Sequence, residues 1–535
     1  MKLLSAAFLN HDASISIMED GNLIKYKLAE RKSRIKHDND ISDLFMEELE
    51  NVEKYECINV NTNANHYDYG EYFSKSWLKF KENYSTVKQI IVNTKDHHLC
   101  HAYCGFYTSN FEDALCIVID GNGSYFSGKD LGIASEKFTE IESVYEFKRN
   151  KLNKILFKRY IPEFLTPIKT NMYELVNKIL NDDKMFDLNF ANSSSVKLSK
   201  SKYLSKEHPG AGILFNICGF SMGFKWCDSG KMMGLAQYKN HKDKLPVRYS
   251  DSNWRKKVDL SYNVQKFAEE KIYEIVKKYV DETGNRNVVL TGGVSLNCVS
   301  NYNLLKKIPD INIHIDPMCS DNGISIGRSL ISYIYKTKKQ PKRILSTYLG
   351  HSENLEKLKK KVQKYKNFNH RKVTYSDVVQ ILLEGKVISL FQGKSEAGQR
   401  SLGNRSLLFD PRVKNGRTVV NRIKKREDYR PFAASILLEK TSEWFDLKSL
   451  KESPTMSFAV DAYENAIREV PSVIHADNTC RIQTVTLEQN YHFFKLIEEF
   501  YKKTNVPMLL NTSFNLAGQP LVETFEHAMQ SLNNS

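Results

Sequence analysis

Two features that the sequence lacks limit what this protein can be. None of its apolar stretches reaches the roughly 18 to 20 residues that a membrane-spanning helix requires, so we expect no membrane partner. The apolar run at residues 3–9 ends too early for a secretory leader. The nine cysteines include no Cys-x-x-Cys pair and are odd in number, which indicates free thiols in a reducing compartment. We therefore predict a cytoplasmic protein.

Acidic residues are also in short supply. The chain has 63 Asp and Glu against 78 Lys and Arg, which gives a formal net charge of +15 over 535 residues. Excess positive charge favours anionic partners such as nucleotides, phosphates or nucleic acid, although a diffuse excess over a solvated surface gives the same total. A chain of this length suggests two or three domains.

The densest group of potential metal ligands lies at residues 96–102. His97 and His101 are four residues apart, so on a helix both imidazoles occupy one face and can share an ion. Two histidines leave coordination positions open, and a distant carboxylate would complete a site suited to Fe(II) or another divalent ion. We predict that Asp321 supplies it. Packing alone also produces histidines at this spacing, so the prediction depends on the motifs below.

Several expected strands end in turns rich in glycine or aspartate. The apolar run 114–119 stops at the segment 120–124, the strand 288–290 enters a glycine pair, and the segment 316–327 repeats the arrangement. Bare backbone at such turns lets a phosphate or nucleotide approach closely. The repetition resembles the actin-like ATPases, in which such turns from two related halves face one cleft.

Basic residues crowd into two neighbouring intervals. Six lie between 148 and 159 with aromatic residues among them, and four lysines follow between 197 and 206. This mixture suits contact with nucleic acid, whereas a solvated basic helix is the plainer explanation. We expect residues 147–209 to be an insertion. The basic, polar stretch 335–343 predicts a linker between two domains, 1–340 and 341–535.

Beyond this linker, cationic side chains recur beside glycines and strand ends. The strand 387–391 opens into the segment 392–406, further Lys and Arg lie at 424–430 and 475–481, and a last strand ends at 511–515. Guanidinium groups bind phosphoryl oxygens two at a time. We therefore predict a phosphate-binding pocket in the second domain.

Eight motifs, in order along nearly the whole chain, identify a family. They are HDAS at 11–14, HHLCHA at 97–102, GKMMGLA at 230–236, GGVSLN at 292–297, SDNG at 320–323, LGNRS at 402–406, RPFA at 430–433 and NTSFN at 511–515. Together they resemble the O-carbamoyltransferases of antibiotic and Nod-factor biosynthesis. The resemblance implies an α/β protein in which a two-lobed, actin-like ATPase (Kae1-like) domain is followed by a YrdC-like α/β domain.

The resemblance also implies a reaction in two stages. Carbamoyl phosphate and ATP, with Mg, give carbamoyl adenylate in the YrdC-like domain, and phosphate and pyrophosphate leave. The adenylate passes internally to the Kae1-like domain, where an acceptor hydroxyl takes the carbamoyl group and AMP leaves. An enclosed route protects the reactive anhydride from water.

Carried onto this sequence, the resemblance assigns four sets of site residues. The metal ligands, which the resemblance implies to hold iron, are His97, His101 and Asp321. The candidates for orienting or deprotonating the acceptor hydroxyl are His11, Asp12 and Asp228. The nucleotide would be lined by Asp120, Gly121, Gly123, Gly292, Gly293 and Asn297. Carbamoyl phosphate and the ATP phosphates would be bound by Lys424, Arg430, Arg400, Arg405 and Arg481, with Asn511 and Ser513 completing the pocket.

The identity of the acceptor remains open. Residues 123–212 are longer and more basic than the family leads us to expect, which favours an anionic acceptor, and a hydroxymethylated pyrimidine in DNA or as a nucleotide is the first choice. The alternatives are a sugar or natural-product hydroxyl, threonylcarbamoyl transfer to tRNA, and a non-catalytic nucleic-acid-binding scaffold. A monomer and a homodimer both remain open. Since relatives usually continue beyond the position of Ser535, we expect the second domain to be trimmed or completed by a partner.

Overall fold

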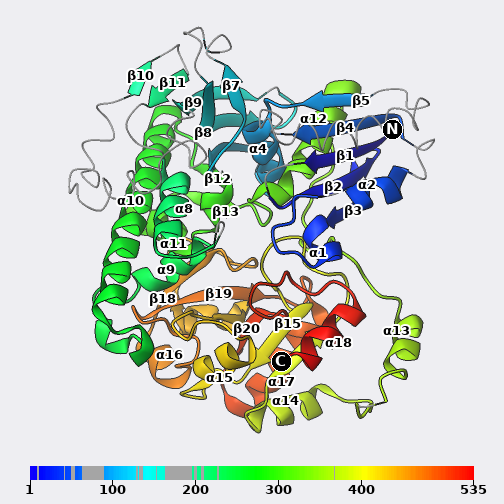
Figure 1. Cartoon of the computed structure of the whole chain (residues 1–535), viewed down its shortest axis with the longest axis vertical. Helices are drawn as coiled ribbons and strands as arrows, with labels where there is room; N and C mark the ends of the chain where they lie inside the picture. The colour runs from blue at the N-terminus through cyan, green and yellow to red at the C-terminus, as the bar shows by residue number, and fades with distance from the viewer. Residues whose placement is uncertain are drawn as a thin grey trace. The chain divides into compact units, whose positions relative to one another are not determined.

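The computed structural model describes residues 1–8, 11–40, 42–49, 55–62, 90–127, 131, 137–151, 153–162, 195–197, 202–205, 210–225, 228–366 and 368–535. The chain divides into two compact units (Figure 1). The first consists of Met1–Ser33, His37–Ala236 and Lys256–Leu345, and the second of Arg34–Lys36, Gln237–Arg255 and Ser346–Ser535. None of the helices among the described residues is long and apolar enough to cross a membrane.

The first unit contains two sheets. The five-stranded sheet has the order β3 (Asn22–Leu28), β2 (Ser14–Glu19), β1 (Lys2–Phe8), β4 (Cys57–Thr62) and β5 (Ile90–Asn93). β1 runs antiparallel to β2 and parallel to β4. The short helices α1 (Ala29–Ser33) and α2 (Ser42–Leu49) follow β3. The loop after β1 therefore leaves the sheet at the end where the chain reaches His11 and Asp12.

The eight-stranded sheet provides a second set of strand ends. Its order is β10 (Ser195–Lys197), β11 (Lys202–Ser205), β9 (Lys154–Pro162), β8 (Lys137–Lys148), β6 (Asp113–Ile119), β12 (Asn287–Thr291) and β13 (Asn312–Ile315), and β7 (Tyr125–Ser127) pairs with β8. β6, β12 and β13 are parallel, so their carboxyl ends lie at one edge of the sheet. That edge carries the predicted glycine and aspartate turns.

The segment predicted as a basic insertion begins within this sheet. Residues 137–148 and 154–162 form the antiparallel strands β8 and β9, and short strands at 195–197 and 202–205 extend the same sheet. Residues 163–194 and the side chains of the lysines between 197 and 206 lie outside the described part of the chain.

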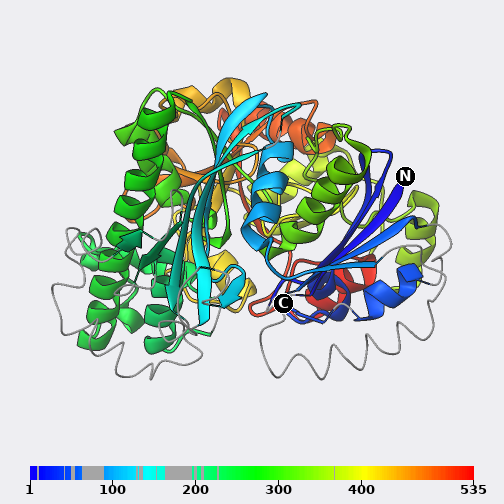
Figure 2. The same ribbon diagram turned by 90° about the horizontal axis from the view of Figure 1, so that it is seen from above.

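Two helices lie between the sheets. α4 (His97–Thr108) packs on β6, β8 and β12, α12 (Ile324–Thr337) packs on β1, β2 and β4, and the two helices contact each other (Figure 2). Gly327 permits this contact, because a Cβ there would overlap the backbone carbonyl of Cys100. Two sheets with packed helices between them confirm the predicted two-lobed, actin-like α/β architecture of the N-terminal part.

Further helices of the first unit follow β11 and β12 along the chain. They are α8 (Ala211–Ser221), α9 (Gly230–Ala236), α11 (Cys298–Lys307) and, from Lys256 onward, α10 (Ser252–Thr283). α11 begins at the glycine turn after β12, where the side chain of Asn297 accepts a hydrogen bond from the backbone N–H of Ser300 at 3.1 Å. This contact caps the first turn of the helix.

The second unit is built on one mixed, seven-stranded sheet. The order is β14 (Ile388–Phe391), β15 (Arg405–Phe409), β20 (Met508–Ser513), β16 (Ala433–Leu437), β19 (Thr479–Val485), β18 (Phe458–Ala462) and β17 (Phe445–Asp446). Only β16 and β19 pair in parallel among these strands. This is the second α/β unit expected from the sequence.

Helices surround this sheet. α17 (Tyr491–Thr504) packs on β16 and β20, and α14 (Tyr375–Leu383) packs on α17. The remaining helices of the second unit are α13 (Leu355–Val362), α15 (Gly416–Ile423), α16 (Glu464–Glu469) and α18 (Phe525–Asn533). The segment Gln237–Arg255 also belongs here, since Lys244 Nζ donates to the backbone carbonyl of Ala476 at 2.8 Å.

Candidate metal centre

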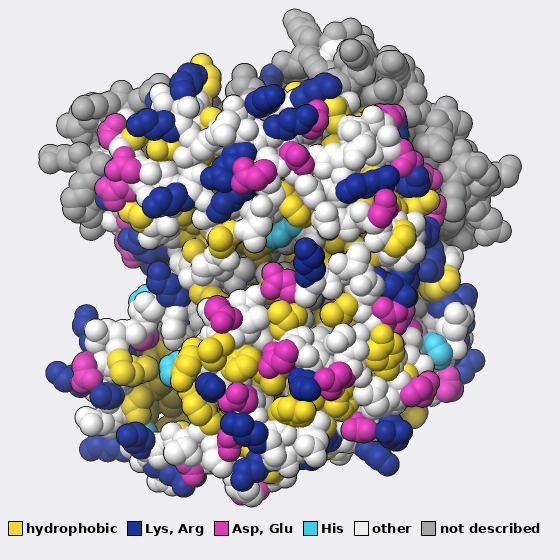
Figure 3. Space-filling model, turned by 180° about the vertical axis from the view of Figure 1, so that it is seen from behind, with side chains coloured by type: hydrophobic (Ala, Val, Ile, Leu, Met, Phe, Trp, Pro, Cys, Tyr) yellow, Lys and Arg dark blue, Asp and Glu magenta, His cyan; other side chains and the backbone are white. Residues whose placement is uncertain are grey.

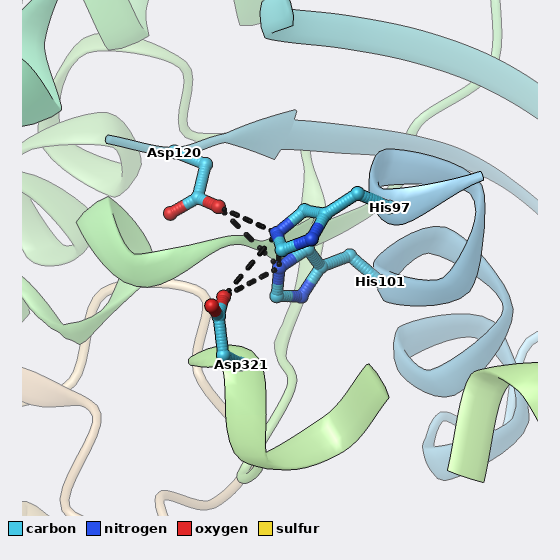
Figure 4. Close-up of side chains that lie close together, drawn as sticks. All are labelled: His97, His101, Asp120 and Asp321. Atoms are coloured by element: carbon cyan, nitrogen blue, oxygen red, sulfur yellow. Dashed lines mark hydrogen bonds and ion pairs between the residues drawn. The ribbon is translucent and has the colours of Figure 1, made fainter. Parts of the chain in front are cut away.

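Helix α4 presents two histidines to one point in the interior of the first unit. The helix begins at His97, and the imidazoles of His97 and His101 lie on one face, as their spacing predicts. Both side chains are buried, and their Nε2 atoms are 3.2 Å apart (Figure 4). Two imidazole nitrogens this close can share a proton or a metal ion.

Two carboxylates from distant segments complete the group. Asp321 lies in the turn that precedes α12, and its Oδ1 is 3.2 Å from His97 Nε2 and 3.5 Å from His101 Nε2. Asp120 lies directly after β6, and its Oδ2 is 3.1 Å and 3.5 Å from the same two nitrogens. One ligand atom from each residue lies within 4.8 Å of the other three. The structure thus brings together the three predicted ligands and adds Asp120.

The backbone fixes the orientation of Asp120. Its Oδ1 accepts hydrogen bonds from the N–H groups of Gly121 at 2.8 Å and Gly293 at 3.0 Å. Gly292, with φ of 86°, lies where a Cβ would overlap the carbonyl of Ile119, so only glycine allows this approach of the two strand ends. The glycine turns, which we predicted to contact nucleotide, therefore also hold Oδ2 of Asp120 toward the histidines.

The carboxylates of the centre favour positive charge beside them. Burial alone would lower the pKa of His97, but the charge of Asp321 and hydrogen bonds to Asp120 and Asp321 raise it to about 10. The pKa of His101 is also raised against the effect of burial, by hydrogen bonds to the same carboxylates. Burial opposes ionisation of Asp321, yet the histidines lower its pKa to about 2. Two buried carboxylates thus remain ionised beside two basic nitrogens.

The donor set fits a divalent ion. Two imidazole nitrogens and two carboxylate oxygens are the ligands that Fe(II) and similar borderline ions accept, and their convergence in a buried site is costly without a cation between them. His97, His101, Asp120 and Asp321 would hold such an ion.

A second histidine cluster adjoins the centre. Asp12, which is buried, has His11 Nδ1 3.2 Å from Oδ2 and His37 Nδ1 2.8 Å from Oδ1, and it accepts a hydrogen bond from Ser320 Oγ at 2.9 Å. His11 Nε2 lies 3.8 Å from Asp321 Oδ2. Burial disfavours the Asp12 anion, but the two histidines hold its pKa well below the usual range. The chain of contacts runs from the metal ligands to His37.

His37 was missed in the sequence analysis. It lies in an irregular segment after α1, next to Asp38 in the sequence, and belongs to no periodic pattern or motif. Its backbone N–H donates to Glu30 Oε2 at 3.1 Å, which helps to fix the loop. His98, between the two ligands, points away: its Nδ1 lies 2.9 Å from Ser143 Oγ, and burial, against the charge of Glu140, lowers its pKa to about 4.

Other predicted residues of the first unit have mixed surroundings. Asn297 caps α11, and its amide also donates to Gln265 Oε1 at 2.8 Å. Asp228, just before α9, pairs with Lys231 at 2.9 Å. Gly123 lies against the ring of His98, where a Cβ would overlap it. Their roles toward nucleotide or acceptor stay predictions.

In the second unit, the structure gathers several cations. Lys424 is buried, and its Nζ donates to the backbone carbonyl of Asn515 at 2.8 Å, to Asn515 Oδ1 at 2.9 Å and to Ser513 Oγ at 3.4 Å. Burial, together with the charges of Arg426 and Arg430, holds the pKa of Lys424 well below its usual range. Arg426 was not predicted as a site residue. An anion bound here would relieve this repulsion.

Arg481 extends this group of cations. After burial, the charges of Arg430 and Arg481 are the main causes that lower the pKa of Arg426, so these side chains lie within electrostatic reach of one another. Arg430 is half-buried and lies 3.5 Å from Glu427 Oε2. Ser513 Oγ is oriented by a hydrogen bond to Asn515 Oδ1 at 2.6 Å.

Arg405 and Asn511 have other partners. The guanidinium of Arg405 is fully buried, donates to the carbonyls of Gln392 at 2.6 Å and His351 at 3.1 Å, and lies 3.8 Å from the centre of the Phe391 ring. Asn511 donates to Ser435 Oγ at 2.9 Å inside the sheet. These contacts stabilise the fold, and the phosphate contact predicted for Arg405 has no counterpart among them. Arg400 is half-buried in the loop before β15.

Two family models match segments of this chain. The model described as Carbamoyltransferase N-terminus matches residues 247–330, and the model described as Carbamoyltransferase C-terminus matches residues 379–535. Nodulation protein NolNO of Sinorhizobium fredii is 27% identical over 97% of this chain and 76% of its own length. Nodulation protein NolO of Bradyrhizobium diazoefficiens is 28% identical over 81% of this chain and 75% of its own.

An archaeal protein and a solved structure are also similar. The uncharacterized protein MJ1051 of Methanocaldococcus jannaschii is 28% identical over 97% of this chain and 94% of its own length. Full-length HypF in a phosphate- and nucleotide-bound form aligns with a TM-score of 0.38 and 16% identity, over 62% of this chain and 55% of HypF, so this chain spans about half the length of HypF.

Both matched models describe one class of enzyme. The first model matches a segment near the middle of the chain, and the second matches its C-terminal part. Both matched segments are therefore those of a carbamoyltransferase, the class of enzyme that the eight motifs predicted.

Removal of one imidazole tests the metal centre. We expect His101→Ala to reduce the bound iron from about one ion per chain to near zero after loading with Fe(II) and desalting, because only one nitrogen and the carboxylates remain. Elemental analysis measures the metal content. His492→Ala is the control, since that imidazole bonds the Tyr375 hydroxyl in the second unit. Full metal retention in His101→Ala would contradict the assignment.

Metal uptake should release protons. In the metal-free protein at pH 7, a pKa of about 10 keeps His97 protonated, and the pKa of His101 is raised as well by its hydrogen bonds to the two carboxylates. The pKa values of Asp120 and Asp321 are lowered, so both carboxylates are already ionised. A metal ion displaces the proton from Nε2 of His97, so we expect release of about one proton or more per ion and weaker metal binding as the pH falls. Titration calorimetry in buffers of different ionisation enthalpy measures the number of protons released. Metal binding without proton release at pH 7 would show that the histidines do not bind the ion.

His37 should act through His11 and Asp12. We expect His37→Ala to slow carbamoyl transfer about tenfold while the metal content stays unchanged, because the loss of a supporting hydrogen bond misorients Asp12. His37→Asn, which keeps a donor near Asp12, should recover part of the rate. Rates and metal content are measured together, and loss of metal in both variants would assign His37 to the centre itself.

Proposed function

We propose that this carbamoyltransferase works in two stages that depend on ATP. Carbamoyl phosphate is hydrolysed to carbamate and phosphate, and a carbamate oxygen then attacks the α-phosphorus of ATP, which forms carbamoyl adenylate and releases pyrophosphate. An acceptor hydroxyl next attacks the carbamoyl carbon, the bond to AMP breaks, and the hydroxyl proton passes to a base. The observation that carries this proposal is that one carbamoyltransferase chain holds two separate charge centres, one of metal ligands and one of cations.

We assign the adenylate-forming stage to residues 341–535. The crowded cations Lys424, Arg426, Arg430 and Arg481 support this assignment, because a pocket in which burial and like charges destabilise the charged forms gains most from bound phosphate. Guanidinium and ammonium groups stabilise the charge that builds up as the anhydride forms. Ser513, beside Lys424, would position a phosphoryl oxygen. ATP would enter with Mg.

We assign the transfer stage to residues 1–340. Asp12 accepts from His11 Nδ1, which leaves Nε2 to take the proton of the acceptor hydroxyl, and Asp228 would orient that hydroxyl. The turn at Gly292 and Gly293 offers bare backbone to the adenylate. A divalent ion held by His97, His101, Asp120 and Asp321 would supply Lewis acidity toward a phosphoryl or carbonyl oxygen. All the described cysteines are free thiols, in keeping with reaction in the cytoplasm.

For the acceptor, we propose a hydroxymethylated pyrimidine in DNA or as a nucleotide. The formal net charge of +15 supports an anionic substrate. Its exocyclic hydroxyl is a primary alcohol that can attack the carbamoyl carbon. If a duplex is the substrate, the target base must leave the stack to reach a buried centre.

Mass spectrometry of the products tests the proposal. The reaction contains ATP, Mg²⁺, carbamoyl phosphate and Fe(II), with hydroxymethylcytosine DNA, its free nucleotide and a neutral aminosugar offered in parallel. We expect DNA or nucleotide to gain about 43 daltons, the mass of CONH₂ replacing H. Gain on the aminosugar alone would refute the anionic acceptor, and the absence of AMP and pyrophosphate in every reaction would refute the adenylate.

Two variants separate the stages in the same assay. His101→Ala should abolish transfer but keep most of the pyrophosphate release that depends on carbamoyl phosphate, whereas Arg430→Ala should lose both. Equal loss of both activities in His101→Ala, with the protein folded by circular dichroism, would contradict the assignment of one stage to each unit.

A further inference from the structure

Most of the basic residues between 148 and 159 form ion pairs within the fold. Lys158 Nζ lies 2.7 Å from the buried carboxylate of Glu140, and Arg159 pairs with Glu142. At the end of β8, Lys148 lies 3.1 Å from Glu146 and Arg149 lies 2.7 Å from Glu112. Four of the six cations between 148 and 159 therefore already have carboxylate partners, and they contribute little net positive potential to a partner.

A second basic segment, at residues 353–372, differs in this respect. It contains eight Lys and Arg against two Glu, a net charge of +6 in twenty residues. The two glutamates of the segment form ion pairs with Lys359 and Lys361. Five further lysines are exposed and form no ion pair among the described residues: Lys357, Lys360, Lys364, Lys366 and Lys372. We name these five side chains the α13 surface.

Residues next to the α13 surface fix this segment to the second unit. Lys361 Nζ lies 3.0 Å from Glu353 and 3.0 Å from Glu526, which starts α18. The ring of Tyr365 packs edge-on against Phe525 with centroids 5.6 Å apart. Figure 1 shows α13 at the margin of the second unit, and Figure 3 shows dark blue Lys and Arg side chains over the molecular surface. The lysines are thus presented on an anchored segment.

The arrangement along the chain suits a linear polyanion. Lys357, Lys360 and Lys364 follow each other at intervals of three and four residues, so they lie along one side of α13 and its last turn. Phe368, whose side chain is partly exposed, lies among them and offers a ring on which a base can stack. Leu358 and Val362 are half-buried, and Leu355 is the single exposed apolar residue of α13, which is too little apolar surface to enter a lipid bilayer.

We propose that the α13 surface is a docking site for nucleic acid, which contacts backbone phosphates through these lysines. The inference rests on the proposed function, since it gives a polynucleotide acceptor a place to bind on this chain. It differs from the carbamoyl-phosphate pocket, whose cations are largely withdrawn from solvent. Phosphate contacts of this kind are independent of base sequence and fall with salt concentration.

Binding of labelled DNA, followed by fluorescence anisotropy at several salt concentrations, tests the proposal. The variant carries Lys357→Gln, Lys360→Gln and Lys364→Gln. We expect its affinity to fall about tenfold or more, and the slope of log affinity against log salt to shrink by about 3. The control carries Lys440→Gln, Lys448→Gln and Lys495→Gln, which remove the same charge from lysines paired with Glu443, Asp446 and Glu498. Equal melting temperatures establish that both variants are folded.

The outcomes separate this inference from the proposed function. Weakened DNA binding in the α13 variant alone, with unchanged carbamoylation of the free nucleotide, supports the docking site. DNA binding by the α13 variant equal to that of the control overturns it, even where the wild type carbamoylates DNA. Binding of the wild type to anionic vesicles but not to DNA overturns it as well. DNA binding lost in the α13 variant, with no acceptor gaining mass, supports the surface and refutes the acceptor.

Discussion

The convergence of two imidazoles and two carboxylates on one buried point is the constraint on which the first unit depends. Their ligand atoms lie within 4.8 Å of one another, where uncompensated charge is costly. Helix packing holds them there. Arg328 of α12 lies 3.0 Å from Asp96, the residue directly before α4, and Gly327 lets the two helices approach. The segment bearing His97 is therefore tied to the helix that follows Asp321.

Small polar residues extend this arrangement to the five-stranded sheet. Ser14 Oγ donates to Ser325 Oγ at 2.8 Å, and Ser16 and Ser5 bond to Ser329 at 2.9 Å and 2.8 Å. Short side chains allow α12 to lie close to β1 and β2, and their hydroxyls satisfy each other within the buried interface. The loop after β1 is thereby placed so that Asp12 reaches Ser320, next to the ligand Asp321.

The sequence predicted those features of the site and the fold that depend on local patterns. The spacing of His97 and His101 predicts a shared face, and motif order led to Asp321 and to the two α/β units. The fourth candidate ligand, Asp120, needs the parallel alignment of β6 with β12, since the Gly293 amide fixes its carboxylate. The sequence shows an acid at a strand end but not which oxygen faces the histidines. His37 depends on a loop with no repeating pattern.

Charge was harder to predict than position. Nothing local distinguishes Arg405, whose guanidinium binds backbone carbonyls in the interior, from Arg430, which is half-buried among other cations. The basic run near residue 150 looked suited to anions, but its partners Glu140 and Glu142 are on the neighbouring strand, and long-range pairing decides which lysines remain available. In the described part of the chain, five of the lysines at 353–372 have no such carboxylate partner.

The central claim is that one divalent ion is bound by His97, His101 and two carboxylates. X-ray absorption spectroscopy at the iron edge, on protein loaded with Fe(II), tests it most directly. The account predicts a first shell of nitrogen and oxygen with outer-shell scattering from two imidazoles per iron, reduced to one in His97→Ala. A spectrum without imidazole scattering, or one unchanged by His97→Ala, would contradict it.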